Sequence, residues 1–187
     1  MIEDIKAALE VLQKGGVILY PTDTIWGLGC DACNEEAVKR IYAIKNRTDS
    51  KSMLVLMENA ALLERYVEEV PDIAYDLIEL TDKPLTIVYD GAKNLARNLV
   101  ADDGSIGIRI TTEAFSSDLI RRFKRPIVST SANVSGKPSP GCFDEIDLLI
   151  IDAVDYVVKY RQDDIHKAVA SSIMKLGRGG EIKIIRP

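Results

Sequence analysis

Small polar side chains crowd into residues 129–139 of this 187-residue sequence, directly after the apolar run 126–128. The segment combines serine, threonine, asparagine and lysine with a loop rich in glycine and proline. Such side chains let a ligand approach the backbone closely, and they offer both hydrogen-bond donors and acceptors. A solvated loop seldom needs so many of them in so short a span. We therefore interpret this segment as part of a binding site.

A second polar segment is the turn Thr22-Asp23-Thr24, which follows the short apolar run 17–20. Ligands bind at strand ends in α/β proteins because side chains and free backbone N–H groups converge there. An ordinary turn that uses proline and threonine for its geometry explains the same residues. Taken alone, the turn favours this simpler interpretation.

Basic side chains follow the end of a predicted helix, at Lys45, Arg47 and Lys51. Cations there interact favourably with the helix dipole, which is a sufficient structural reason. The functional alternative is a phosphate site, in which arginine binds bidentately and lysine acts as a point charge.

Arg109, inside the apolar run 106–110, also has two interpretations. It either faces solvent, or it faces a cleft and binds a carboxylate.

The three cysteines and the single histidine offer a minimal zinc set: Cys30, Cys33, Cys142 and His166. However, Cys142 and His166 lack paired spacing, and Cys30 does not begin a helix as a thioredoxin-type cysteine would. We therefore favour cysteines that pack as small hydrophobic residues. The sequence also lacks a Walker A loop, a G-x-G-x-x-G motif and a nucleophile elbow.

The rest of the sequence predicts the elements that must position these groups. Helices are expected at 3–14, 35–45, 59–69, 71–81, 112–124 and within 143–153. Strands are expected at 17–20, 53–57, 85–89, 106–110, 126–130, 156–160, 170–176 and 181–185, with a further apolar stretch at 25–30. Residues 177–180 predict a tight hairpin between the last two strands. Because strands and helices interleave without strict alternation, we expect one mixed-sheet α/β (α+β) domain over residues 1–187.

The amino-acid composition limits the classes of function that this chain can have. The chain has 24 Lys and Arg against 29 Asp and Glu, and this net charge of −5 argues against a dedicated duplex-DNA binder. A hydrophobic fraction of 47% fits a folded chain with a real core. No apolar run approaches the roughly 20 residues of a membrane span, so no membrane partner is expected. An acidic N-terminus and three cysteines favour a cytoplasmic location.

Taken in order, these motifs resemble the threonylcarbamoyl-AMP synthase family (TsaC, with the YrdC-like domain), in its short, single-domain bacterial type. The resemblance runs from about residue 15 to residue 187. The motifs that carry it are Tyr20-Pro21-Thr22-Asp23-Thr24, Gly27-Leu28-Gly29, Lys45-Asn46-Arg47, Ile106-Gly107-Ile108-Arg109, Ser129-Thr130-Ser131-Ala132-Asn133-Val134-Ser135-Gly136 and Ile185-Arg186-Pro187. The resemblance implies a YrdC-like twisted mixed β-sheet, flanked by helices, with a basic concave cavity.

The implied activity condenses L-threonine, bicarbonate or CO₂, and ATP into threonylcarbamoyl-adenylate, with release of pyrophosphate. Mg²⁺ would accompany the nucleotide, and no metal-binding side chains are assigned. A tRNA-modifying threonylcarbamoyl-transferase complex would take up the product to form N6-threonylcarbamoyladenosine at position 37 of tRNA. Weak contact of the chain with tRNA or double-stranded RNA is a further possible partnership.

The family's functional residues fall on matching positions of this sequence. The implied catalytic residues are Lys45, Arg47, Ser131 and Asn133. The implied ATP contacts are Arg47, Lys51, Ser105, Ser131, Ser139 and Arg186. The implied threonine contacts are Thr24, Arg109, Ser129 and Ser171. These roles suit the chemistry, because a carboxylate favours a guanidinium and attack on the α-phosphorus needs charge stabilisation rather than a protein nucleophile.

The alternative function is a non-catalytic RNA-binding module of the same fold. Its densest basic run is Arg121, Arg122, Lys124 and Arg125, for which a solvated helix C-terminus is the simpler interpretation. The sequence also departs from the family at Thr48, where proline is usual, and at Asp23, where many members carry glutamate. The complete Lys-x-Arg and Ser-Ala-Asn set nevertheless favours catalysis.

Overall fold

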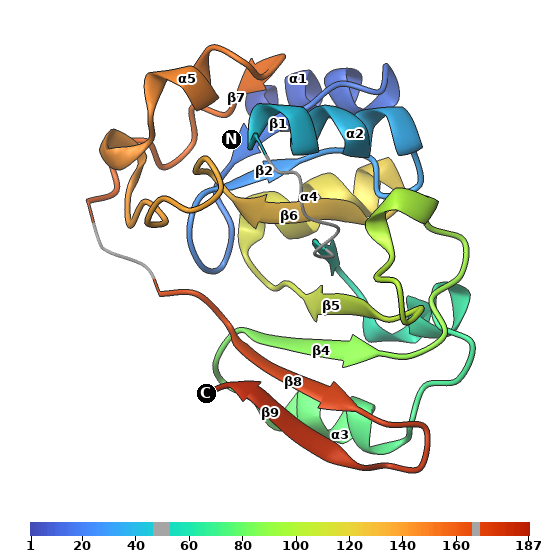
Figure 1. Ribbon diagram of the computed structural model, residues 1–187. Helices are drawn as coiled ribbons and strands as arrows, with labels where there is room; N and C mark the ends of the chain where they lie inside the picture. The colour runs from blue at the N-terminus through green and yellow to red at the C-terminus, as the bar shows by residue number, and fades with distance from the viewer. Residues whose placement is uncertain (47–52, 166–168) are drawn as a thin grey trace.

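The computed structural model describes residues 1–46, 53–165 and 169–187, and these residues form a nine-stranded mixed sheet (Figure 1). The strands are β1 (Ile18–Tyr20), β2 (Gly27–Gly29), β3 (Leu54–Met57), β4 (Leu85–Tyr89), β5 (Ile106–Ile110), β6 (Ile127–Ser131), β7 (Tyr156–Val157), β8 (Ser172–Leu176) and β9 (Ile182–Arg186). Their order in the sheet is β7-β1-β2-β6-β3-β5-β4-β8-β9. The pairs β1–β7, β3–β5 and β4–β8 are parallel, and the remaining neighbours are antiparallel.

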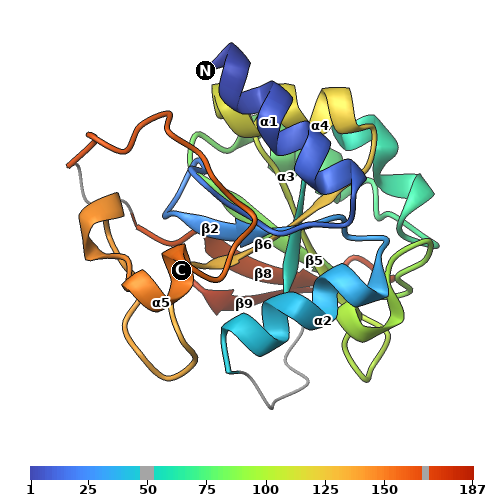
Figure 2. The same cartoon turned by 90° about the horizontal axis from the view of Figure 1, so that it is seen from above.

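Helices cover both faces of this sheet. They are α1 (Ile2–Gln13), α2 (Glu35–Ile44), α3 (Ile73–Leu80), α4 (Ala114–Phe123) and α5 (Leu148–Ile151), with 3-10 turns η1 (Ala60–Arg65), η2 (Arg97–Leu99) and η3 (Phe143–Glu145). Figure 2 shows α1, α3 and α4 on one side of the sheet and α2 and α5 on the other. The central strands are therefore buried on both sides, and this explains why β5 reads as an apolar run around Arg109.

Local sequence explains where the helices begin and end. The Asn34 side chain caps α2 by accepting hydrogen bonds from two backbone N–H groups, as the sequence predicts. Gly15 follows α1 with a φ of +75°, and its neighbour's N–H bonds back to the Val11 carbonyl 2.8 Å away. Glu113 caps α4 through the backbone N–H groups of Phe115 and Ser116. These caps hold the helices against one continuous core.

The predicted fold class, a mixed α/β sheet flanked by helices, is confirmed. The hairpin at 177–180 is also confirmed, with the Gly177 N–H bonded to the Glu181 carbonyl at 2.9 Å. The α-helix predicted for 59–69 is wrong, because the segment forms only the 3-10 turn η1. The backbone leaves the helix at Val67 to bridge Ala92. Strand β7 is shorter than the predicted 156–160. No helix among the described residues is long and apolar enough to span a membrane.

Candidate active site

One pocket, about 200 Å³ in volume, collects most of the polar residues that the sequence singled out. It lies where the turn after β1, the middle strands β3 and β5, the end of β6 and the β8–β9 hairpin approach one another. Of the implied site residues, those that line it are Thr24, Arg109, Ser129, Ser131, Ser139, Ser171 and Arg186. These residues lie far apart in the sequence, and the order of the strands in the sheet brings them together.

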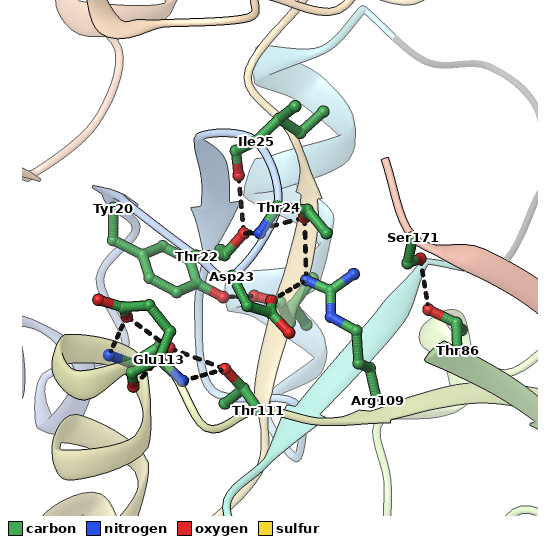
Figure 3. A network of polar contacts seen from close by, with 12 residues as sticks. Tyr20, Thr22, Asp23, Thr24, Ile25, Thr86, Arg109, Thr111, Glu113 and Ser171 are labelled. Atoms are coloured by element: carbon green, nitrogen blue, oxygen red, sulfur yellow. Dashed lines mark hydrogen bonds and ion pairs between the residues drawn. The ribbon is translucent and has the colours of Figure 1, made fainter. Parts of the chain in front are cut away.

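Arg109 forms the floor of this pocket and is almost wholly buried, with 3% of its side chain exposed. Its Nη2 lies 2.9 Å from Asp23 Oδ1 and donates to Thr24 Oγ1 at 3.2 Å (Figure 3). Its Nε is buried and has no hydrogen-bond partner among the described residues. A guanidinium binds a carboxylate through two parallel N–H groups. The side chain therefore faces a cleft, and the solvent-facing interpretation is wrong.

Burial makes the Asp23–Arg109 pair costly. It raises the pKa of Asp23, although the nearby Arg109 charge acts in the opposite direction. Burial also lowers the pKa of Arg109. Both shifts oppose the charged forms, as expected for a buried ion pair whose desolvation exceeds its Coulomb attraction. Such perturbed groups in a pocket are typical of functional sites.

The turn that carries Thr24 is organised by its own hydroxyl groups. Thr22 Oγ1 donates to the Ile25 carbonyl at 2.8 Å and accepts from the Thr24 N–H at 3.0 Å. The two threonine hydroxyls also lie 3.0 Å apart. Pro21 and the threonines therefore do build the turn, and they aim the Thr24 hydroxyl at Arg109 while doing so (Figure 3). The structural interpretation of this segment is confirmed, and its functional interpretation stays a prediction.

The opposite wall includes Ser171 and residues of the C-terminal hairpin, and β4 lies beside that hairpin in the sheet. The buried hydroxyls of Thr86 and Ser171 lie 2.8 Å apart (Figure 3). Arg186 Nε donates to the Ser171 carbonyl at 2.8 Å. Thr86 pairs in register with Arg109 on β5 and with Ile173 on β8, so one residue links both sides of the pocket floor.

Lys45 is buried at the end of α2 and binds the polar loop after β6. Its Nζ donates to the Ser131 carbonyl and to the Asn133 carbonyl, the latter at 2.7 Å. The Ser135 N–H bonds back to the Lys45 carbonyl at 2.9 Å. Asn133 Nδ2 donates to the Lys137 carbonyl at 2.6 Å, which closes the loop on itself. Lys45 and Asn133 therefore hold the loop that carries Ser131 and Ser139.

Three of the implied nucleotide contacts cannot be assigned to this pocket. Arg47 and Lys51 lie outside the described residues. Ser105 does not line the pocket: it lies at the other end of β5 from Arg109, and its hydroxyl donates to Asp103 at 2.6 Å. Ser139 lines both the first pocket and a neighbouring one of about 300 Å³ beside Asn133.

The sequence predictions missed three residues that organise the site: Asp23, Thr86 and Arg161. Asp23 stood in a recognised motif, but no pattern identified its partner. Thr86 is one polar residue in an apolar strand, which alternation also explains. Arg161 bonds the Thr22 carbonyl from far along the chain. No local signal in the sequence could have identified that contact.

The cysteines and the basic run have structural partners. Cys30 is wholly buried, which agrees with packing as a small hydrophobic residue. Burial raises the pKa of Cys33 to about 11. Among the described residues, no group of three or more His, Cys, Asp or Glu side chains could hold a metal ion. In the basic run, Arg121 and Arg122 both pair with Asp118, and Arg125 pairs with Asp31. Two carboxylates, Asp118 and Asp31, therefore compensate two of the run's four positive charges.

Comparison with known proteins identifies the family. A family model described as "Telomere recombination" matches residues 10–187. The chain belongs to that family, Sua5/YciO/YrdC. This Sua5/YciO/YrdC chain is 38% identical to the threonylcarbamoyl-AMP synthase of Pseudoalteromonas translucida, over 71% of this chain and 73% of the relative. It is 32% identical to the threonylcarbamoyl-AMP synthase of Pseudomonas aeruginosa, over 84% of this chain and 86% of the relative. The family resemblance seen in the motifs is confirmed.

The fold of this Sua5/YciO/YrdC chain is similar to a solved structure with a ligand. That structure is the crystal structure of P. abyssi Sua5 complexed with L-threonine, with a TM-score of 0.83 and 27% identity. The match covers 92% of this chain and 50% of that one, so the chain spans about half the length of that Sua5.

Proposed function

We propose that this chain is a threonylcarbamoyl-AMP synthase, which condenses L-threonine, bicarbonate or CO₂, and ATP into threonylcarbamoyl-adenylate and pyrophosphate. The observation that carries the proposal is the convergence of four threonine-contact candidates on one pocket. They are Thr24, Arg109, Ser129 and Ser171. Curated relatives named for this activity, and a similar Sua5 structure that holds L-threonine, support it.

In the proposed threonine subsite, Arg109 binds the substrate carboxylate. Its Nε–H is buried and has no protein partner among the described residues, so the protein does not use all the hydrogen-bonding capacity of this guanidinium. Buried and preorganised, the guanidinium favours an anion more strongly than an exposed one does. The hydroxyls of Thr24, Ser129 and Ser171 surround it and supply the donors and acceptors that an amino acid's ammonium and hydroxyl groups need.

The proposed nucleotide subsite lies on the side of the polar loop. Ser131 and Ser139 line the pocket, and Ser139 also lines the neighbouring cavity beside Asn133, to which we assign part of the nucleotide. Arg186 contributes a second guanidinium to the same pocket. We assign Lys45, Arg47 and Lys51 to the phosphate side of the reaction, with Lys45 also holding the loop through its carbonyl contacts.

The reaction then needs positioning and charge stabilisation. The neutral threonine amine attacks the carbon of CO₂ and loses a proton, or attacks bicarbonate with loss of water, and a carbamate forms in either case. A carbamate oxygen then attacks the α-phosphorus of ATP, and pyrophosphate leaves. Donors around the phosphates stabilise the developing charge, and no covalent enzyme intermediate is required. We assign any Mg²⁺ to the nucleotide's own phosphates, because Mg²⁺ at such sites is bound mainly by substrate phosphates and water.

The decisive experiment measures pyrophosphate release from ATP with and without L-threonine and bicarbonate, and it identifies the product by mass. We expect release to require both co-substrates and to yield a threonylcarbamoyl-adenylate mass. Tight binding of tRNA or double-stranded RNA without any turnover would instead favour the RNA-binding alternative. Product uptake by a cytoplasmic tRNA-modifying threonylcarbamoyl-transferase complex is part of the proposal, and transfer to tRNA in a reconstituted mixture tests it.

A further inference from the structure

The side chain of Arg161 joins the turn that carries Thr24 to two distant parts of the chain. Its Nη1 donates to the Thr22 carbonyl at 3.2 Å and lies 3.7 Å from Glu113 Oε1. Its Nη2 and Nε donate to Asp164 Oδ2 at 3.1 and 3.3 Å. Glu113 in turn caps α4. One guanidinium therefore ties the turn after β1 to the start of α4 and to the segment after β7.

Arg161 holds this position at a backbone cost. Its φ is +67°, in the left-handed region that residues other than glycine rarely adopt. Such a conformation persists only where surrounding contacts over-determine it, and these positions cluster at functional sites. The other non-glycine residues with positive φ in the described chain are two asparagines, which tolerate it, and Lys124, which ends α4. Neither explanation applies to Arg161, so we attribute its backbone conformation to the contacts that its side chain makes.

The segment around Arg161 has anchors of its own. Tyr160 stacks on Phe115 with ring centroids 6.1 Å apart. The Val158 N–H bonds to the Leu19 carbonyl at 2.9 Å, beside the parallel pair β1–β7. Loss of the Arg161 guanidinium would therefore leave the segment in place and release mainly the turn at residues 22–24.

We propose that Arg161 is a positioning residue for the threonine subsite. Its bond to the Thr22 carbonyl fixes the turn, the Thr22 hydroxyl fixes the Thr24 N–H and hydroxyl, and Thr24 then lies against Arg109. Arg161 itself does not line the pocket, so it acts through these contacts. The inference rests on the proposed function, because it assumes that threonine binds in the pocket that Thr24 and Arg109 line.

The test compares Arg161→Gly with Lys124→Gly. Both substitutions remove the backbone strain of a left-handed residue, since the two residues have similar φ values. Lys124, however, lies at the far end of α4, away from the pocket. Loss of the Arg161 side-chain contacts should lower the melting temperature, and relief of the left-handed backbone should offset part of that decrease in Arg161→Gly. We also expect the KM for threonine to rise on the order of tenfold. The KM for ATP should stay within about twofold of wild type. Lys124→Gly should change neither KM.

Other outcomes overturn the inference. Unchanged KM values in Arg161→Gly would show that the turn needs no support from this residue. An equal rise in both KM values with a large drop in melting temperature would show a general structural role. Arg161→Asn, which tolerates the same backbone conformation but cannot reach Thr22, repeats the test if the glycine variant folds poorly. Calorimetric binding of L-threonine to the wild-type protein separates the two proposals: no binding refutes the proposed function and this inference together, whereas equal binding to wild type and variant refutes only the inference.

Discussion

The substitution Asp23→Asn tests whether the buried pair at the pocket floor serves ligand binding. Arg109 and Asp23 have only 3% and 14% of their side chains exposed, so loss of the carboxylate leaves a buried guanidinium without its counter-charge. Breaking a buried pair in this way costs about 3–5 kcal/mol. In a chain of this size, each kcal/mol lowers the melting temperature by about 2–4 °C, so we expect a decrease on the order of 10 °C.

L-Threonine should reverse much of this loss, because its carboxylate supplies the missing counter-charge to Arg109. Differential scanning calorimetry at increasing threonine should therefore show a larger rise in melting temperature for Asp23→Asn than for wild type. The matched control combines Asp23→Asn with Arg109→Met, which removes both charges. It should regain most of the stability and lose the response to threonine. If Asp23→Asn melts at the wild-type temperature, or gains no more from threonine than wild type does, the reasoning is refuted.

Three further substitutions probe the pocket walls and the fold. Thr86→Val keeps the side-chain shape but removes the hydroxyl bonded to Ser171, so stability should fall by about 1 kcal/mol and the KM for threonine should rise, as melting curves and steady-state kinetics would show. Ser139→Ala should raise the KM for ATP and leave that for threonine unchanged; the reverse would contradict the proposed nucleotide subsite. A hydrogen bond from Arg40 holds the pKa of Asp155 below its ordinary 3.8, so this carboxylate stabilises the fold at neutral pH, and the contribution is lost as the pH falls through the folded-state pKa. Asp155→Asn should therefore lower the melting temperature near neutral pH, and the difference from wild type should shrink as the pH falls through the folded-state pKa of Asp155.

The sequence predicted those parts of the fold and site that depend on local pattern. Apolar runs identified the main strands, and Asn34 identified the start of α2, because side-chain burial and capping act over a few residues. The polar segments at strand ends also became pocket walls. The role of each of these residues remains a prediction, since the structure shows where they lie and not what they bind.

The parts that could not be predicted depend on pairing over long distances. Residues 60–65 have a helical pattern, yet the bridge between Val67 and Ala92 draws the backbone away after one 3-10 segment. Likewise, β4 lies between β5 and β8, so Thr86 meets both Arg109 and the start of the C-terminal hairpin. A single sequence does not encode such neighbours in any short window, and sheet order is needed to see them.

Several costly local features lie around the proposed threonine subsite. Asp23 and Arg109 are charged groups whose pKa values both move against ionisation because they are buried. Arg161 adopts a left-handed backbone, and Arg109 Nε is buried without a partner in the described chain. Natural proteins keep such costly features chiefly at functional sites. These features lie on the turn at residues 22–24, on β5 and on the segment after β7, and they support the proposed site without reference to any relative.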